Sequence, residues 1–352
     1  MTFADGPVRI VADDLTGALD AAAPFARPDQ PVGLVLHATQ IPDRAALTIS
    51  SESRSLDRTG AALATVRACD VLREDDDGRA LWFHKVDSVL RGQPFDATAA
   101  MMAHLKLPRC LFAPAFPAMG RITRAGRHLV RTGDHWRPSA KSDISKGLRL
   151  AGLIPASEDA GWMTAANALV LDAETQGDLD RAVVRQTDPR LLWVGSRALA
   201  EALAGAVVPV PCPPIAVLVI GTTHPATRAQ VAFSATRLSR VAESGPIRPD
   251  PGQCMLIDPV SRTANAALTF AAVHKAILRV DPESLRGRCL FVTGGETLAV
   301  VLKAADARSL DCLGEIGPGL PISVVRGGRL DGCSIVSKSG GFGAHDLLAS
   351  YC

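Results

Sequence analysis

The sequence predicts an α/β protein with two three-layer α/β/α domains whose sheets are mainly parallel. Short apolar runs alternate with helix-like segments along most of the chain, and several of these runs stop abruptly at polar loops. Such alternation is typical of doubly wound parallel sheets. It is interrupted by Pro209-Val210-Pro211-Cys212-Pro213-Pro214, because consecutive prolines fit neither a helix nor a central strand. We therefore expect an N-terminal domain over 1–208, a linker over 209–215 and a C-terminal domain over 216–352.

Composition and charge exclude several classes of function. The chain has 352 residues and a formal net charge of +2, and no basic stripe is interleaved with aromatic residues, so we expect no nucleic-acid partner. No apolar run reaches the about 18–20 residues of a membrane span, and the N-terminus lacks the pattern of a secretory signal. We therefore expect a cytoplasmic protein without a membrane partner. The eight cysteines form no C-x-x-C pair, which argues against zinc and against a disulfide framework.

The first domain opens with a strand, a polar turn and a helix. Residues 8–12 form a short apolar strand that stops at Asp13-Asp14, and apolar residues then recur at helical spacing from Leu15. Asp14 is placed to cap the amino end of that helix, which is the commoner use of Asp at such a turn. The same alternation predicts further strands at 32–36, 47–50, 80–83, 110–113, 168–171 and 191–194, and helices at 59–71, 95–105, 175–185 and 197–206.

The most informative loop is Lys85-Val86-Asp87-Ser88-Val89-Leu90-Arg91-Gly92, which follows the strand at 80–83. Open α/β sheets bind ligands at the carboxyl ends of their strands. This loop offers two cations, one carboxylate and one hydroxyl, a set that suits a small anion with hydroxyl groups of its own. We predict a small hydroxy acid as the ligand. The alternative is a surface turn laced with ion pairs.

A long basic segment follows the strand at 110–113. It contains Arg124, Arg127, His128, Arg131 and His135, and it shows no regular apolar pattern. Long irregular segments in compact domains are commonly binding loops or lids. The positive charge suits an anionic substrate, and an exposed arginine-rich loop is the alternative.

The second domain carries two glycine-rich turns between an apolar strand and a helical segment. They are Thr293-Gly294-Gly295-Glu296-Thr297 and Ser339-Gly340-Gly341-Phe342-Gly343. Glycine lets backbone N–H groups approach phosphate oxygens, and a helix N-terminus adds partial positive charge. Neither turn matches a P-loop or a dinucleotide-binding fingerprint. Strands are expected at 216–220, 256–257, 289–292 and 334–338, and helices at 226–239, 266–280, 298–305 and 345–350.

These features together favour phosphoryl transfer from a nucleotide. That reaction needs a carboxylate near the accepting hydroxyl, donors around the transferred group, and a divalent ion on the phosphates. Asp14 and Asp87 are candidates for the carboxylate, and Glu296 or an aspartate for holding Mg²⁺ through water. The sequence does not identify the metal ligands.

Six motifs occur along the chain in this order: Ala12-Asp13-Asp14-Leu15-Thr16-Gly17-Ala18, Glu52-Ser53-Arg54, the 85–92 loop, Pro114-Ala115-Phe116-Pro117-Ala118-Met119-Gly120-Arg121, Thr293-Gly294-Gly295-Glu296-Thr297 and Ser337-Lys338-Ser339-Gly340-Gly341-Phe342-Gly343. Together they resemble the four-carbon acid sugar kinase family, which includes D-threonate, D-erythronate and 3-oxo-tetronate kinases. The resemblance runs from about Val8 to Leu348. It implies an ATP-dependent kinase, with Mg²⁺, that phosphorylates the terminal (4-) hydroxyl of a four-carbon sugar acid in a cleft between the domains.

The resemblance also implies a role for each domain. The N-terminal domain would bind the sugar acid through Asp13, Asp14, Arg54, Lys85, Asp87, Ser88 and Arg91. The C-terminal domain would bind ATP through Thr222, His224, Gly294, Gly295, Glu296, Thr297, Gly340 and Gly341. Three features depart from the family: His224 stands where a Ser is often found, Leu19 replaces a polar residue, and the chain looks short between Ser239 and Cys254.

The mechanism that follows is a hypothesis. Arg54 and Lys85, with Arg91, would clamp the substrate carboxylate, and Asp87 or Asp14 would deprotonate the terminal hydroxyl. The alternatives are a non-catalytic sensor of sugar acid and nucleotide, and a kinase for a different polyol acid. A homodimer is compatible with the sequence, which does not show the oligomeric state.

Overall fold

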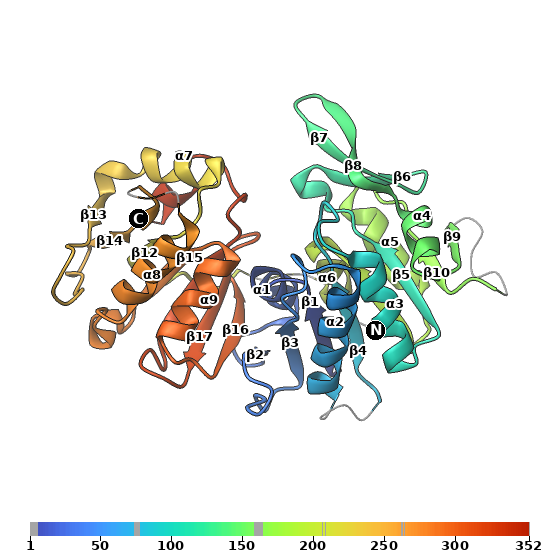
Figure 1. Cartoon of the computed structure of the whole chain (residues 1–352), viewed down its shortest axis with the longest axis horizontal. Helices are drawn as coiled ribbons and strands as arrows, with labels where there is room; N and C mark the ends of the chain where they lie inside the picture. Colours follow the sequence, from blue (N-terminus) through green and yellow to red (C-terminus); the bar gives the residue numbers. More distant parts are fainter. Residues whose placement is uncertain are drawn as a thin grey trace. The chain divides into compact units, whose positions relative to one another are not determined.

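The computed structural model describes residues 6–73, 78–157, 165–205, 207, 209–261, 263 and 265–351. The chain divides into two compact units (Figure 1). The first unit comprises Met1–Phe25 and Asp43–Val207, and the second comprises Ala26–Pro42 and Val208–Cys352. The break after Val207 lies beside the proline-rich run. The segment Ala26–Pro42 differs from the expected boundary, because its strand β2 (Val32–Val35) pairs with β16 (Ser309–Glu315) of the second unit.

The main sheet of the first unit is entirely parallel. Its strand order is β3-β1-β4-β11-β5-β10-β9. The bounds of these strands are β1 Val8–Ala12, β3 Ala46–Ser50, β4 Leu81–Lys85, β5 Arg109–Ala113, β9 Pro155–Ser157, β10 Ala168–Val170 and β11 Leu191–Gly195. In β1 and β4 every residue is buried, because helices cover both faces of the sheet.

Helices of the first unit form two layers. Helix α2 packs on α3 and α3 on α4, whereas α1 and α5 pack on α6. Their bounds are α1 Leu15–Ala22, α2 Arg58–Arg73, α3 Pro94–Leu105, α4 Ile144–Leu150, α5 Gln176–Arg185 and α6 Arg197–Ala204. Local sequence sets their starts: Thr175 and Asp178 form a reciprocal capping box at α5, and Ser196 caps α6.

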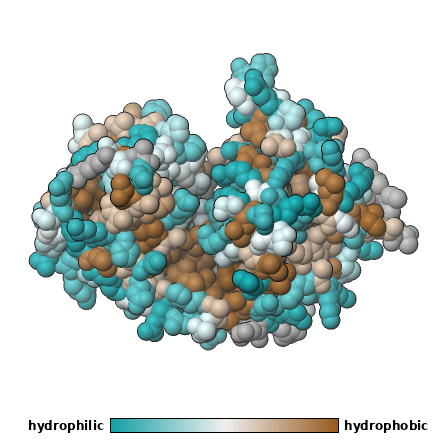
Figure 2. Space-filling view, viewed as in Figure 1, coloured by the Kyte–Doolittle hydropathy of each residue, from teal (hydrophilic) through white to brown (hydrophobic). Residues whose placement is uncertain are grey.

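A small antiparallel sheet occupies much of the basic segment for which the sequence predicted no regular structure. It consists of β6 (Arg121–Arg124), β7 (Arg127–Thr132) and β8 (His135–Asp143), in that order. The prediction of an irregular segment was wrong, because exposed strands rich in arginine lack the apolar alternation by which strands are recognised. The pair β7–β8 projects at the top of Figure 1, and hydrophilic side chains cover its tip in Figure 2.

The sheet of the second unit combines parallel and antiparallel strands. Its order is β13-β14-β12-β15-β18-β17-β16-β2. The first five strands in this order are parallel to one another, whereas the pairs β18–β17, β17–β16 and β16–β2 are antiparallel. The bounds not yet given are β12 Ile215–Ile220, β13 Leu238–Arg240, β14 Cys254–Ile257, β15 Cys289–Thr293, β17 Pro321–Arg326 and β18 Ser334–Lys338. The two sheets confirm the predicted α/β class with mainly parallel strands.

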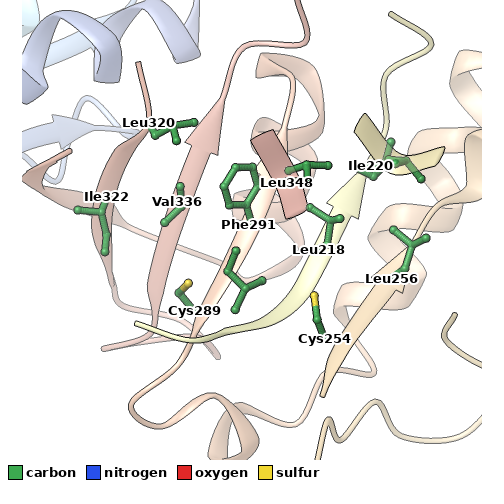
Figure 3. Packing of buried hydrophobic residues seen from close by; sticks show 12 residues of the cluster. Leu218, Ile220, Cys254, Leu256, Cys289, Phe291, Leu320, Ile322, Val336 and Leu348 are labelled. Atoms are coloured by element: carbon green, nitrogen blue, oxygen red, sulfur yellow. The ribbon is translucent and has the colours of Figure 1, made fainter. Parts of the chain in front are cut away.

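Two groups of helices cover this second sheet. Helices α8 (Ala266–Ile277) and α9 (Gly295–Ala304) pack together, and α7 (Pro225–Phe233) packs with the 3₁₀ turn η7 (Leu347–Ser350). The core on the α7 side includes Val231 of that helix and Leu348 of η7, and Figure 3 shows Leu348 lying over Phe291 of β15. Each group therefore covers one of the two faces of the sheet, as the three-layer prediction requires.

Candidate functional site

Polar side chains from three strand ends meet at one edge of the first unit's main sheet. Asp13 and Asp14 follow β1, and Arg54 lies in the loop after β3. The Arg54 guanidinium donates to both oxygens of Asp13, at 2.8 and 2.7 Å, and to both oxygens of Asp14, at 2.5 and 2.8 Å. Its Nη2 atom lies 3.7 Å from Oδ1 of Asp87, in the loop after β4. One arginine thus links three carboxylates, in a forked geometry that an ammonium group does not offer.

The first turn of α1 explains two residues of this cluster. Oδ1 of Asp14 accepts the Gly17 N–H at 2.8 Å, which confirms the predicted cap, and Oδ2 accepts the Thr16 hydroxyl at 3.1 Å. A side chain at position 17 would collide with the Asp14 carboxylate and lie 3.3 Å from Nζ of Lys85. Glycine at this position therefore lets Lys85, the last residue of β4, approach the aspartates.

The 85–92 loop is folded around the carboxylate of Asp87. Its Oδ2 accepts the N–H groups of Val89 and Arg91 at 3.0 and 3.1 Å, and its Oδ1 accepts the Arg91 side chain at 2.5 Å. Burial alone would raise the pKa of Asp87, but the Arg91 hydrogen bond and the charges of Arg54 and Lys85 hold that pKa well below its ordinary value. Asp87 is therefore a firmly ionised group that already accepts three hydrogen bonds.

Asp13 and Lys85 have different electrostatic surroundings. Burial raises the pKa of Asp13 above its ordinary value, although the hydrogen bond and charge of Arg54 oppose the shift. The Lys85 ammonium is buried, and the described residues supply it with one acceptor, the Val86 carbonyl oxygen at 3.0 Å. Because an ammonium carries three N–H donors, Lys85 retains capacity to bind an acceptor on a ligand.

The small sheet supports the 85–92 loop and adds a further cation. His128 on β7 hydrogen-bonds through Nε2 to the Ser88 carbonyl oxygen at 2.8 Å, and Lys141 on β8 donates to the Gly92 carbonyl oxygen. Arg121 on β6 donates to the Met119 carbonyl oxygen, and its buried Nε atom has no partner among the described residues. Burial lowers the pKa of Arg121, the charge of Asp87 opposes this, and that of Arg91 adds to it.

The structure thus brings together most of the residues predicted for the sugar acid. One cluster, which we call the charged cluster, contains Asp13, Asp14, Arg54, Lys85, Asp87 and Arg91. The roles of these residues stay predictions. Ser88 lies in the same loop, but no hydrogen bond of its hydroxyl to the cluster occurs among the described residues. No role was assigned to Arg121 or His128 from the sequence: Arg121 ends the Pro114–Arg121 motif, and His128 was named only as part of the basic segment.

The second unit gathers the residues predicted for the nucleotide at the carboxyl ends of β12, β15 and β18. A Cβ atom on Gly340 would lie 3.0 Å from the Thr222 hydroxyl oxygen, and one on Gly341 would lie 3.1 Å from Nε2 of His224. A side chain at Gly221 would collide with Thr297. We call this set of closely packed turns the glycine cradle, comprising 221–224, 294–297 and 339–343.

Two helices begin in the glycine cradle, and they differ in their caps. Helix α7 is capped by His224, whose Nδ1 accepts the Ala226 N–H at 3.2 Å. Helix α9 begins after Gly294, which has φ 92° and provides no side-chain cap. The first N–H groups of α9 are therefore open to an anion. A Cβ atom on Gly340 or Gly341 would fill the glycine cradle, so the missing side chains leave room for phosphate oxygens.

Glu296 is the carboxylate in the first turn of α9, and its side chain is exposed. Kinases commonly hold Mg²⁺ through one or two carboxylates together with substrate phosphates. Within the described residues, no group of three or more His, Cys, Asp or Glu side chains is arranged to hold a metal ion.

A pocket of about 260 Å³ lies in the second unit beside β13, β14 and α8. Leu256, Ile257 and Ala276 give it apolar walls, and Arg240 and Lys275 add positive charge. The pocket also includes the buried carboxylate of Asp258, which accepts from Arg228 at 2.8 and 3.1 Å. Since β14 neighbours β12 in the sheet, the pocket and the glycine cradle belong to adjoining strands.

Two family profiles match the chain. One, described as the sugar-binding N-terminal domain, matches residues 8–150, and the other, described as the nucleotide-binding C-terminal domain, matches residues 257–348. In the part of the chain that the structure describes, no helix is long and apolar enough to cross a membrane.

The chain is similar over nearly its whole length to enzymes named D-threonate kinase. The enzyme of Bordetella bronchiseptica is 28% identical over 398 residues, covering 97% of this chain and 96% of that protein. The enzyme of Salmonella typhimurium is 27% identical, covering 96% of both chains. A 3-oxo-tetronate kinase of Pseudomonas fluorescens is 34% identical over 96 residues, which are 26% of this chain and 22% of that protein. The first alignment is 46 positions longer than this chain, so the relative contains sequence that this chain lacks.

Solved structures share the fold. A Salmonella typhimurium protein superposes with a TM-score of 0.76 at 20% identity, and a Haemophilus influenzae protein with 0.67 at 17% identity. Each superposition covers 97% of this chain and 98% of the other.

Kinases that align along nearly the full length of both chains define the class of protein. The chain is an enzyme, a phosphotransferase with an alcohol group as acceptor. With both domain profiles matched in order, it belongs to the four-carbon acid sugar kinase family.

Proposed function

We propose that this enzyme uses ATP to phosphorylate the terminal (4-) hydroxyl of a four-carbon sugar acid such as threonate, erythronate or 3-oxo-tetronate. The observation that carries the proposal is the cluster of Asp13, Asp14, Arg54, Lys85 and Asp87, which combines carboxylates for a hydroxyl with cations for a carboxylate. The first unit would bind the sugar acid and the second the nucleotide. A cleft between the domains remains part of the proposal.

The substrate carboxylate would be bound by cations that keep free donors. Arg54 donates to Asp13 and Asp14 through all three of its nitrogen atoms, so it orients the aspartates more than it attracts an anion. Lys85 retains N–H donors, and Arg121 has a buried Nε atom without a partner among the described residues. We therefore assign the carboxylate to Lys85 and Arg121, with Arg91 at the rim, where its side chain is 62% exposed.

The general base would be Asp14. Asp87 binds two backbone N–H groups and Arg91, and its pKa is held low, so it is a poor proton acceptor. Asp14 also accepts hydrogen bonds, from Gly17, Thr16 and Arg54, but its side chain is 19% accessible against 6% for Asp87, so a substrate hydroxyl can approach it more easily. We assign Asp87 to holding the 85–92 loop and Asp14 to accepting the proton of the substrate hydroxyl.

The nucleotide would bind to the second unit. Its phosphates would contact the glycine cradle and the uncapped start of α9, and its base would enter the 260 Å³ pocket on the neighbouring strands. Glu296 is the candidate for holding Mg²⁺ through water. The ion would supply charge neutralisation across the phosphate oxygens.

The test is ADP release from Mg-ATP with a panel of four-carbon acids. D- and L-threonate, D- and L-erythronate and 3-oxo-tetronates would be compared with longer aldonates as controls. We expect turnover with at least one four-carbon acid and a kcat/KM at least tenfold lower with longer acids, since missing or misplaced hydroxyl contacts leave buried polar groups unpaired. Binding of ATP without turnover on any acid would favour the sensor. Turnover confined to longer acids would favour a kinase for a different polyol acid.

A further inference from the structure

A buried lysine lies directly beneath the third turn of the glycine cradle. Lys338, the last residue of β18, is 1% exposed. Its Nζ atom donates to the carbonyl oxygens of Ser339 and Phe342, at 2.9 and 3.0 Å, and to the Thr227 hydroxyl oxygen at 3.1 Å. All three N–H donors of the ammonium are therefore used, and two of them fix the backbone of the 339–343 turn.

Helix α7 completes the support of this turn with two uncharged side chains. The Thr227 hydroxyl donates to the Gly340 carbonyl oxygen at 2.7 Å. Gln230 donates through Nε2 to the carbonyl oxygens of Phe342, Gly343 and Ala344, at 3.0, 3.1 and 2.8 Å. The carbonyl groups of the turn are thereby bound on the side of α7 and Lys338.

The Lys338 ammonium has no carboxylate partner among the described residues. Helix α7 is capped by His224, the residue before it, and carries Arg228, which binds Asp258. The paired strand β15 carries no Asp, Glu, Lys, Arg or His between Cys289 and Thr293, and His345 and Asp346 beyond the turn are exposed. Burial lowers the pKa of Lys338 to about 8, with no contribution from a charged neighbour.

We propose that Lys338 is a positioning residue for the phosphates of the nucleotide, holding the 339–343 turn in its binding shape and directing an uncompensated positive charge toward them. The inference rests on the proposed function, since it requires a polyphosphate in the glycine cradle. A buried charge without a partner is unfavourable in the free protein. A bound polyanion would offset that cost, so the charge contributes to binding and not to the fold.

A substitution separates this role from a structural one. Lys338→Met keeps an unbranched side chain, one atom shorter, and removes the charge, and Lys303→Met removes an exposed charge from the last turn of α9 as the matched control. We expect Lys338→Met to raise the KM for ATP at least tenfold and to leave the KM for the sugar acid within twofold. Its thermal midpoint at pH 7 should stay close to that of the wild type. The loss of three hydrogen bonds is offset by removal of a buried charge whose proton the unfolded chain binds more tightly than the folded one. A wild-type KM for ATP in a folded Lys338→Met variant would overturn the proposal.

A second variant keeps the charge and weakens its link to the turn. Thr227→Val removes the hydroxyl that joins Lys338 to Gly340. We expect a smaller rise in the KM for ATP, of about three- to fivefold for the loss of a net hydrogen bond. If both variants lost the fold, Lys338 would be a structural residue and the proposal would fail.

The affinity for Mg-ADP as a function of pH tests the charge without any sugar acid. Calorimetry between pH 7 and 9.5 should show the wild-type affinity falling as the pH passes about 8, where Lys338 loses its proton. The Lys338→Met profile should be flat over this range. A flat wild-type profile, or no binding of Mg-ADP, would contradict the proposal. Binding of Mg-ADP with the expected pH profile but without turnover on the acid panel would instead overturn the proposed function alone.

Discussion

The charged cluster of the first unit and the glycine cradle of the second lie at equivalent positions in their sheets, yet they are made of different groups. Both form where parallel strands end, the usual ligand position in this class of fold. The charged cluster consists of ionised side chains, with Arg54 bound to two aspartates and Asp87 bound to Arg91. The glycine cradle consists largely of backbone, glycine and threonine, and its single buried charge, Lys338, lies beneath it.

This difference indicates how each site achieves selectivity. Ionised side chains in fixed geometry can distinguish acids that differ in one hydroxyl, because an unmatched group is left unpaired. Backbone N–H groups contact phosphate oxygens, which are alike in every nucleotide. We therefore expect the charged cluster to lose activity or affinity for the acid when a side chain loses its charge. The glycine cradle should lose affinity for the nucleotide when a glycine gains a side chain.

The largest effect is expected from Asp14→Asn. Asparagine caps helices as well as aspartate does, and Arg54 keeps its contacts to Asp13, so the fold should be retained. The lost proton acceptor should lower kcat by about 10²- to 10⁴-fold with little change in either KM. Steady-state kinetics with the best acid of the panel would measure this effect.

Asp87→Asn is the matched comparison in the same cluster. An amide retains one acceptor oxygen where the carboxylate offers two, so the N–H groups of Val89 and Arg91 and the Arg91 side chain would compete for it. The expected change is a higher KM for the sugar acid. If Asp87→Asn removed turnover while Asp14→Asn retained it, the base would be Asp87, and the arrangement of roles in the charged cluster would be reversed.

An intermediate effect is expected from Gly294→Ala in the glycine cradle. Gly294 has φ 92° and ψ 140°, a conformation in which a Cβ costs about 1–3 kcal/mol. Moving the start of α9 to relieve this strain should raise the KM for ATP about tenfold, the equivalent of about 1.4 kcal/mol. The KM for the sugar acid should stay within twofold.

Gly332→Ala controls for backbone strain alone. Gly332 also has a positive φ, of 78°, in the turn before β18, and a Cβ there would meet nothing within 4 Å. It should lose stability without any change in nucleotide binding. If Gly294→Ala and Gly332→Ala raised the KM for ATP equally, the effect at Gly294 would come from a general loss of stability and not from contact with the nucleotide.

The sequence predicted the parallel strands well because such strands are buried on both faces and form continuous apolar runs. The strands Val8–Ala12 and Ser334–Lys338 have the predicted bounds. The antiparallel strands β16 and β17 were not predicted. Two buried acidic residues interrupt the apolar pattern of β16. Asp311 accepts a hydrogen bond from Arg326 at 2.6 Å, and Glu315 accepts the Gly319 N–H.

Long-range contacts set the other limit on prediction. The strand Val32–Val35 was predicted as a strand, but its partner Ser309–Glu315 is more than 270 residues away, so nothing local assigns it to the second unit. In the charged cluster, motif residues that cap or end elements were identified from sequence. No role was predicted for Arg121 and His128, although both lie in stretches that stood out in the sequence, because a separate small sheet positions them beside the 85–92 loop.

The smallest effect is expected from Ser88→Ala, and it tests whether the charged cluster also contributes a neutral contact. The Ser88 carbonyl oxygen binds His128, and this bond does not depend on the side chain, so the loop and the stability should be unchanged. If the hydroxyl binds a substrate hydroxyl, kcat/KM should fall about two- to tenfold, corresponding to about 0.5–1.5 kcal/mol. The fall should differ between threonate and erythronate, because a fixed hydroxyl distinguishes the two configurations. Ser145→Ala on α4 is the control, and a uniform or absent effect of Ser88→Ala across the panel would mean that the charged cluster selects its acid by charge and shape without this hydroxyl.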